Sequence, residues 1–126
     1  MDRTTFEING NSFQDFAGFV AEFNREFVTH VGGKWNGNLD AFNDYLSWTN
    51  AHSIIRWSNS AKSRNDLGHD AMADWLSDNL QKCHPSNRPS VHSRLDNAKN
   101  KNGPTLFDTL VEIMQMNAEY VTLQLA

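Results

Sequence analysis

The sequence predicts an α/β fold: a three-stranded parallel sheet packed with helices, carrying an extra helical and irregular insertion. Three short segments have the composition or the alternation of strands, at residues 5–9, 53–57 and 120–125. Helical spacing of apolar residues separates these segments, and strands joined through helices run parallel because the chain crosses over before each new strand. The 126 residues fit a single domain, 1–126, with residues 70–103 as the insertion.

The N-terminal third predicts a strand followed by a helix rich in phenylalanine. Residues 5–9 (TFEIN) alternate between polar and apolar side chains. We expect a helix to open at Ser12, where Asp15 completes a capping box. Glu22 lies off the apolar stripe of this helix, and Gly32-Gly33 is expected to end the segment. The stripe, which indicates core, consists of Phe13, Phe16, Val20, Phe23 and Phe27.

The middle third predicts a short helix, a buried strand and a second helix. Asn36-Gly37 is a turn signal, and Asn38 is a good N-cap for a helix that runs to about Trp48. Residues 53–57 (SIIRW) form a compact apolar run with β-branched side chains, as in a buried strand. The polar residues 58–67 are expected to form a helix that Gly68 ends.

The final third contains two helical patterns on either side of an apolar-poor stretch. Residues 70–82 carry Met72, Trp75, Leu76 and Leu80 at helical spacing. Residues 83–104 hold all three prolines, so we expect a long irregular surface segment there. Residues 105–117 predict a helix, and residues 120–125 (YVTLQL) alternate as a last strand. The expected inward side chains of that last helix are Leu106, Leu110, Ile113 and Met114.

The net charge of −4 is divided unevenly along the chain. Residues 1–50 hold seven acidic and three basic side chains (−4), residues 51–104 hold five and eight (+3), and residues 105–126 hold three and none (−3). If the two acidic ends share a surface, that surface attracts a cationic partner and repels nucleic acid. The alternative is that these charges only solvate the surface.

Composition argues against several classes of protein. The mean hydropathy of −0.61, with no run of about 18 apolar residues, predicts a soluble chain without a membrane span. The first ten residues lack a secretory-signal pattern, and Cys83 is the only cysteine, so we expect a reducing, cytoplasmic location. Because the five histidines lack metal-ligand spacing and no phosphate-binding glycine motif or nucleophile elbow occurs, we expect no metal, no cofactor and no enzyme.

The segment from Gly33 to Trp48 predicts a helix with two chemically different faces. Leu39, Phe42 and Leu46 form the inward stripe. The outward face carries Asp40, Asn43, Asp44 and Ser47. Like charges four residues apart weaken an isolated helix by about 0.2–0.5 kcal/mol, so this pair has a use when a cationic partner closes over it. The alternative is a face that serves only solubility.

The order of residues in this segment resembles a known family. N-L-D-A-F-N-D-Y-L, preceded by an aromatic residue and a glycine, resembles the binding helix of the barstar family of intracellular ribonuclease inhibitors. The flanking F-E-I-N-G, I-I-R-W-S-N-S-A-K-S-R, F-D-T-L-V-E-I and Y-V-T-L-Q-L are similar to its other strands and helices. The resemblance covers roughly residues 4–68 and 104–125.

The resemblance implies an immunity-type inhibitor that blocks the cationic active site of a cognate, small, basic, barnase-like ribonuclease in a 1:1 complex. Carboxylates on the helix would mimic RNA phosphates, with Asp44 as the central acid, Asp40 as its support and Glu112 contributing from the last helix. Trp35 would supply the aromatic residue before the helix. Asn38, Asn43 and Ser47 complete the expected partner-binding set, and the free protein is expected to be a monomer that binds neither nucleic acid nor membrane.

Two departures from the family pattern change the expected partner. Asn43 stands where the founding inhibitor has tryptophan, and Trp48 stands where it has glycine. We therefore expect a different, related ribonuclease as the target. Two alternatives stay open: a barstar-like interaction module with a non-nuclease partner, and a hydrolase that uses Asp40 and Asp44 as acid and base, which would require a pocket and separated pKa values.

Overall fold

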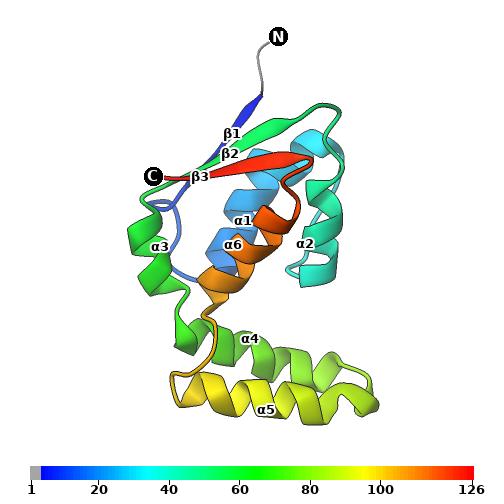
Figure 1. Ribbon diagram of the computed structural model, residues 1–126, viewed down its shortest axis with the longest axis vertical. Helices are drawn as coiled ribbons and strands as arrows, with labels where there is room; N and C mark the ends of the chain where they lie inside the picture. Colours follow the sequence, from blue (N-terminus) through cyan, green and yellow to red (C-terminus); the bar gives the residue numbers. More distant parts are fainter. Residues whose placement is uncertain (1–3) are drawn as a thin grey trace.

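The computed structural model describes residues 4–126 and has an α/β fold (Figure 1). Strands β1 (Thr5–Asn9), β2 (Ser53–Ser58) and β3 (Val121–Leu125) form one parallel sheet in the order β1-β2-β3. In the register of the sheet, Ile55 of β2 pairs with Phe6 on one side and Leu123 on the other. The fold class and the three strands predicted from the sequence are confirmed.

Six α-helices complete the described part of the chain: α1 (Phe16–Phe23), α2 (Leu39–Leu46), α3 (Ser60–Asp66), α4 (His69–Lys82), α5 (Arg88–Lys99) and α6 (Leu106–Met116). Helices α1, α2 and α6 lie together on one side of the sheet, and α4 and α5 form a separate layer at the opposite end of the molecule (Figure 1). A π-helical turn (Asn24–Val28) and a 3-10 turn (Thr29–Val31) extend α1 until Gly32, whose φ of 88° ends the segment.

The core between the sheet and α1 is built from aromatic rings. Phe19 stacks on Trp57 of β2 with ring centroids 5.0 Å apart, and Phe23 lies 4.9 Å from Phe42 of α2. All four of these side chains are fully buried. Phe13, Phe23 and Phe27 of the predicted stripe are buried, as expected of core residues. Together with Phe19, which lay outside that stripe, Phe23 joins α1 to the sheet and to α2.

Helix α1 begins three residues later than the sequence predicted. The carboxylate of Asp15, not the side chain of Ser12, is the N-cap, and it accepts a hydrogen bond from the Gly18 backbone N–H at 2.7 Å. An aspartate in extended backbone conformation caps a helix as well as serine does, so the residue predicted to close the capping box is itself the cap.

Glu22 is buried although it lies off the apolar stripe. Its side chain is only 3% exposed because one carboxylate oxygen accepts from the Asn9 backbone N–H at 2.8 Å and the other pairs with Arg25. The carboxylate thus satisfies a backbone donor at the end of β1, and a buried charge needs such partners. Glu22 ties α1 to the sheet.

The prediction of an irregular segment over residues 83–104 is wrong, because residues 88–99 form α5. Val91, Leu95 and Ala98 of α5 are buried, and they share a core cluster with Met72 and Leu76 of α4. Pro89 lies in the first turn of α5, where a backbone N–H would have no acceptor within the helix, so the lack of an N–H in proline costs nothing there. Helices α4 and α5 therefore form a hairpin.

The chain enters and leaves this hairpin at neighbouring points. The Phe107 backbone N–H donates to the Leu67 carbonyl at 2.8 Å, and a ring nitrogen of His69 lies 2.9 Å from the Gly103 carbonyl oxygen. The hairpin consequently joins the sheet-bearing part of the fold through two adjacent backbone segments at its base.

We expect Thr105→Ala to lower the free energy of unfolding by about 0.5–2 kcal/mol. Thr105 caps α6: its hydroxyl accepts from the Asp108 N–H at 3.0 Å, and the Asp108 carboxylate accepts from the Thr105 N–H at 3.1 Å. Urea unfolding followed by circular dichroism measures the loss. Thr105→Ser keeps the hydroxyl and should stay near wild type, and equal losses for both variants would contradict the capping role.

Candidate protein-binding site

Helix α2 presents its polar residues to solvent, as its sequence predicted. The Asn38 side-chain oxygen caps the helix by accepting from the Ala41 N–H at 3.0 Å. Phe42 and Leu46 are fully buried beneath it. The predicted binding residues Asp40, Asn43, Asp44 and Ser47 are all exposed.

Within the part of the chain that the structure describes, the carboxylates of Asp40 and Asp44 are both unpaired. Neither makes a hydrogen bond or an ion pair with any other residue between 4 and 126, and Ser47 donates to the Asp44 backbone carbonyl at 2.7 Å rather than to its side chain. Asp40 lies in the first turn, where the helix dipole stabilises a negative charge. Two neighbouring negative charges are therefore available to a cationic group from outside.

Trp35 is a positioning residue, and its predicted role as a partner contact is wrong. The side chain is only 3% exposed, packed against Phe23 and Phe42, and its indole N–H donates to the Asn38 carbonyl at 2.7 Å. An aromatic residue before a helix can turn inward as easily as outward, and here the aromatic core between α1 and α2 accepts it. Trp35 supports α2 from below.

Asn24 was not identified from the sequence, and it holds the segment before α2. Its side-chain oxygen accepts from the Trp35 N–H at 2.7 Å, and its amide group donates to the Trp35 carbonyl at 2.8 Å. A side-chain amide that closes two hydrogen bonds on one residue fixes the backbone there. The contact joins residues 11 positions apart in the chain, so helical periodicity gives no sign of it.

Tyr45 attaches the other end of α2 to the same segment. Its hydroxyl donates to the Lys34 carbonyl at 2.8 Å and lies 3.3 Å from the Lys34 N–H. A Cβ on Gly33 would come within 2.2 Å of the Tyr45 ring, so the absence of a side chain there permits the approach. Trp48 packs edge-on against Tyr45 at 4.7 Å.

The remaining flank of α2 contacts the end of α6. The Asn43 side-chain oxygen accepts from the Asn117 amide at 2.7 Å, so this predicted binding residue is partly used inside the molecule. Glu112 is exposed on α6, and no hydrogen bond or ion pair joins it to Asp40 or Asp44 within the described part of the chain. Glu112 thus lies on a neighbouring helix rather than in the acidic pair itself.

Two exposed apolar side chains near α2 were not selected from the sequence. Trp48 is 48% exposed just after α2, and Met116 is 73% exposed beside Asn117. Tryptophan and methionine are enriched at protein interfaces, and an exposed pair at the edge of an acidic helix fits such a surface. Exposure is a tertiary property, so the sequence alone offers only residue type as a signal.

We expect Tyr45→Phe to lower the free energy of unfolding by about 0.5–1.5 kcal/mol, because it removes the hydrogen bond to the Lys34 carbonyl. Urea unfolding measures this loss. Tyr120→Phe is the matched control, since the Tyr120 hydroxyl makes no hydrogen bond with residues 4–126. A larger loss for the control would contradict the role given to Tyr45.

The features of a metal centre or a membrane span do not occur between residues 4 and 126. In this range, no three His, Cys, Asp or Glu side chains gather where they could hold a metal ion. No helix in this part of the chain combines the length and apolarity needed to cross a bilayer.

Fold and site together define an α/β protein with an anchored, exposed acidic helix. No protein-family model matches the chain, and comparisons with curated proteins and with solved structures give no match.

Proposed function

We propose that this protein is a barstar-like inhibitor that places α2 in the cationic active site of a barnase-like ribonuclease. The observation that carries the proposal is the pair Asp40 and Asp44, which are exposed, have no partner among residues 4–126, and lie on a helix that is anchored on both flanks. The anchors are the Asn38 cap, the Tyr45–Lys34 hydrogen bond and the Asn43–Asn117 hydrogen bond.

The arrangement of the elements supports the proposal. The segments that resemble the family form β1, then α2, then β2 with α3, and finally α6 with β3. The stretch without a counterpart in the resemblance, residues 70–103, coincides with the α4–α5 hairpin and its connections. The segment that lacks a counterpart in the family therefore has nearly the same bounds as the hairpin in the structure.

The physical chemistry of such a complex favours rigid acids. Carboxylates that meet Arg, Lys or His⁺ in a closed interface form charge-assisted hydrogen bonds, which are stronger than neutral ones. A helix already held in place loses little freedom on binding, so more of the interaction energy appears as affinity. We expect a 1:1 complex with a monomeric inhibitor, and a cytoplasmic location consistent with the half-buried free thiol of Cys83.

A second candidate is a barstar-like module with a non-nuclease partner. Asn43 favours this candidate. Its side-chain oxygen accepts a hydrogen bond from Asn117, whereas the founding inhibitor of the family has an aromatic residue at this position. The contact surface around the two acids therefore differs from that of the resemblance.

The test is an RNA-cleavage assay with a panel of small basic ribonucleases, including any that the native host encodes. We expect at least one nuclease to lose its activity at one equivalent of inhibitor, with calorimetry giving the same stoichiometry. Free RNA should not bind the inhibitor at physiological salt. If the whole panel stays active and co-purification from the host recovers only non-nuclease proteins, the second candidate replaces the first.

A further inference from the structure

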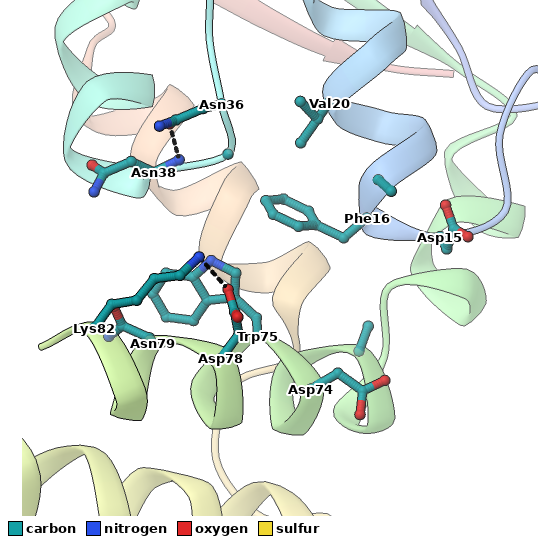
Figure 2. Close-up of a pocket in the computed structure, with 13 residues that line it drawn as sticks. Asp15, Phe16, Val20, Asn36, Asn38, Asp74, Trp75, Asp78, Asn79 and Lys82 are labelled. Atoms are coloured by element: carbon teal, nitrogen blue, oxygen red, sulfur yellow. Dashed lines mark hydrogen bonds and ion pairs between the residues drawn. The ribbon is translucent and has the colours of Figure 1, made fainter.

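The α4–α5 hairpin creates a groove next to α2. The groove has a volume of about 530 Å³ and lies between α1, the loop before α2, and α4. Figure 2 shows Phe16 of α1 and Trp75 of α4 facing this space, with the loop carrying Asn36 and Asn38 along its edge. Such a volume lies within the range of binding pockets, about 300–1,000 Å³.

The chemistry of the groove is aromatic and acidic. Phe16, Val20 and Trp75 supply apolar surface, and all three are only half-buried although they pack on the core. Three carboxylates line the groove, from Asp15 at the start of α1 and from Asp74 and Asp78 on α4, against a single ammonium group on Lys82.

Only some of the carboxylates that line the groove are paired with a cation. Lys82 is paired with Asp78 at 2.9 Å (Figure 2). Asp15 and Asp74 lie toward the other end of the view. Asp74 makes no hydrogen bond or ion pair with residues 4–126, and Asp15 uses one carboxylate oxygen on the Gly18 N–H. Within the described part of the chain, the end of the groove at Asp15 and Asp74 therefore lacks a cation.

The groove continues directly into the acidic helix. Asn38 lines the groove and is also the N-cap of α2, two residues before Asp40. Gly37 has a φ of 98°, and a Cβ added there would lie 3.4 Å from the Phe16 ring, so the loop is in close contact with the groove wall. A protein that covers Asp40 and Asp44 can reach the groove across this loop.

We propose that the groove receives an arginine-bearing loop of the same protein that binds α2. This inference rests on the proposed function, and it gives the α4–α5 hairpin a role in widening the interface. A guanidinium group stacks on aromatic rings and pairs with carboxylates, and the groove lining offers both, in the rings of Phe16 and Trp75 and the carboxylates of Asp15 and Asp74.

Other occupants fit the groove less well. An apolar ligand would displace the water that hydrogen-bonds to the carboxylates and would offer no hydrogen bonds in return. Phosphate-bearing ligands, including nucleic acid, would meet three negative groups and only one paired amine. A second copy of the chain is an alternative that a titration separates by its dependence on protein concentration.

The test is an NMR titration of the full chain with an acetylated and amidated tetra-arginine peptide at low salt. The probe signal is the Trp75 indole N–H, assigned by its loss in Trp75→Phe. We expect it to shift on titration, and we expect Asp74→Asn to weaken the peptide's binding about threefold to tenfold. Asp96→Asn, which removes another exposed carboxylate from α5, should change the binding less than about twofold.

Three results would overturn the inference. The first is a Trp75 signal that does not move with peptide, and the second is a response that is lost in Asp40→Asn/Asp44→Asn while surviving in Asp74→Asn, because the peptide would then bind α2. The third is a Trp75 signal that changes with protein concentration alone, which would assign the groove to a second copy of the chain.

If the cleavage assay identifies a nuclease, the affinity of that nuclease for variants of this protein tests the groove proposal separately from the proposed function. We expect Trp75→Ala to weaken that complex about threefold to tenfold. If the complex depends on Asp44 and is indifferent to both Trp75 and Asp74, the groove proposal fails and the inhibitor proposal stands. If no nuclease binds and the peptide still shifts Trp75 in an Asp74-dependent way, the groove stands as a site for arginine-bearing segments and the inhibitor proposal fails.

Discussion

Replacing Asp44 with alanine should weaken the complex with the proposed target ribonuclease at least about 30-fold, the equivalent of about 2 kcal/mol. The side chain is exposed and has no internal partner among residues 4–126, so its full hydrogen-bonding capacity is available to the nuclease. Its loss would leave cationic groups of the nuclease buried without a counter-charge, which is the costly part of such a truncation. Calorimetry or surface plasmon resonance measures the change in Kd.

The same substitution should leave the fold unaffected. Within the described residues, the Asp44 carboxylate makes no hydrogen bond or ion pair, and its removal relieves repulsion from Asp40 worth about 0.2–0.5 kcal/mol. The urea midpoint should therefore stay at or slightly above that of wild type. Asp96→Ala is the matched control, since this exposed acid of α5 lies on the hairpin's outer helix. An unchanged Kd for Asp44→Ala would remove this residue from the mechanism.

We expect Phe19→Ala to cost about 3–5 kcal/mol of unfolding free energy, well above the losses expected for the capping and tyrosine variants. Phe19 is fully buried and contacts six other aromatic rings. These belong to Phe13, Phe16, Phe23, Trp35, Phe42 and Trp57. Truncation removes apolar contacts and leaves a cavity that rings on three different elements cannot all move to fill.

Urea unfolding of Phe19→Ala measures this cost against a surface control. Met116→Ala removes a side chain that is 73% exposed and should change the free energy of unfolding by less than about 0.5 kcal/mol. A Phe19→Ala midpoint close to wild type would show that the aromatic rings do not form a common core. Because Trp35 and Phe42 share this core, the variant should also loosen α2.

Local signals predicted most of the fold. The alternation in residues 5–9 and 120–125, the Asn38 cap and the apolar spacing of α2 are properties of a few neighbouring residues, and the structure confirms each. Helix α5 was missed because its stripe has only Val91, Leu95 and Ala98, and because prolines at its start indicate a break. A stripe that narrow becomes stable only against a partner helix, which local sequence does not show.

The candidate site was predictable only where it depended on one helix. The outward direction of Asp40 and Asp44 follows from helical periodicity, and the structure confirms it. The backbone of Trp35 is held by Asn24, 11 positions earlier, and the side chain of Asn43 is bound by a residue 74 positions away. The groove requires three segments far apart in the chain to meet, so no local pattern predicts it.

The close spacing of Leu67 and Phe107 at the base of the hairpin has an evolutionary consequence. An arm whose entry and exit are adjacent can be lengthened, shortened or exchanged without shifting the register of the strands or the orientation of α2. In the proposed inhibitor, selection acting on the hairpin would therefore change which related nucleases are recognised, while Asp40 and Asp44 stay unchanged.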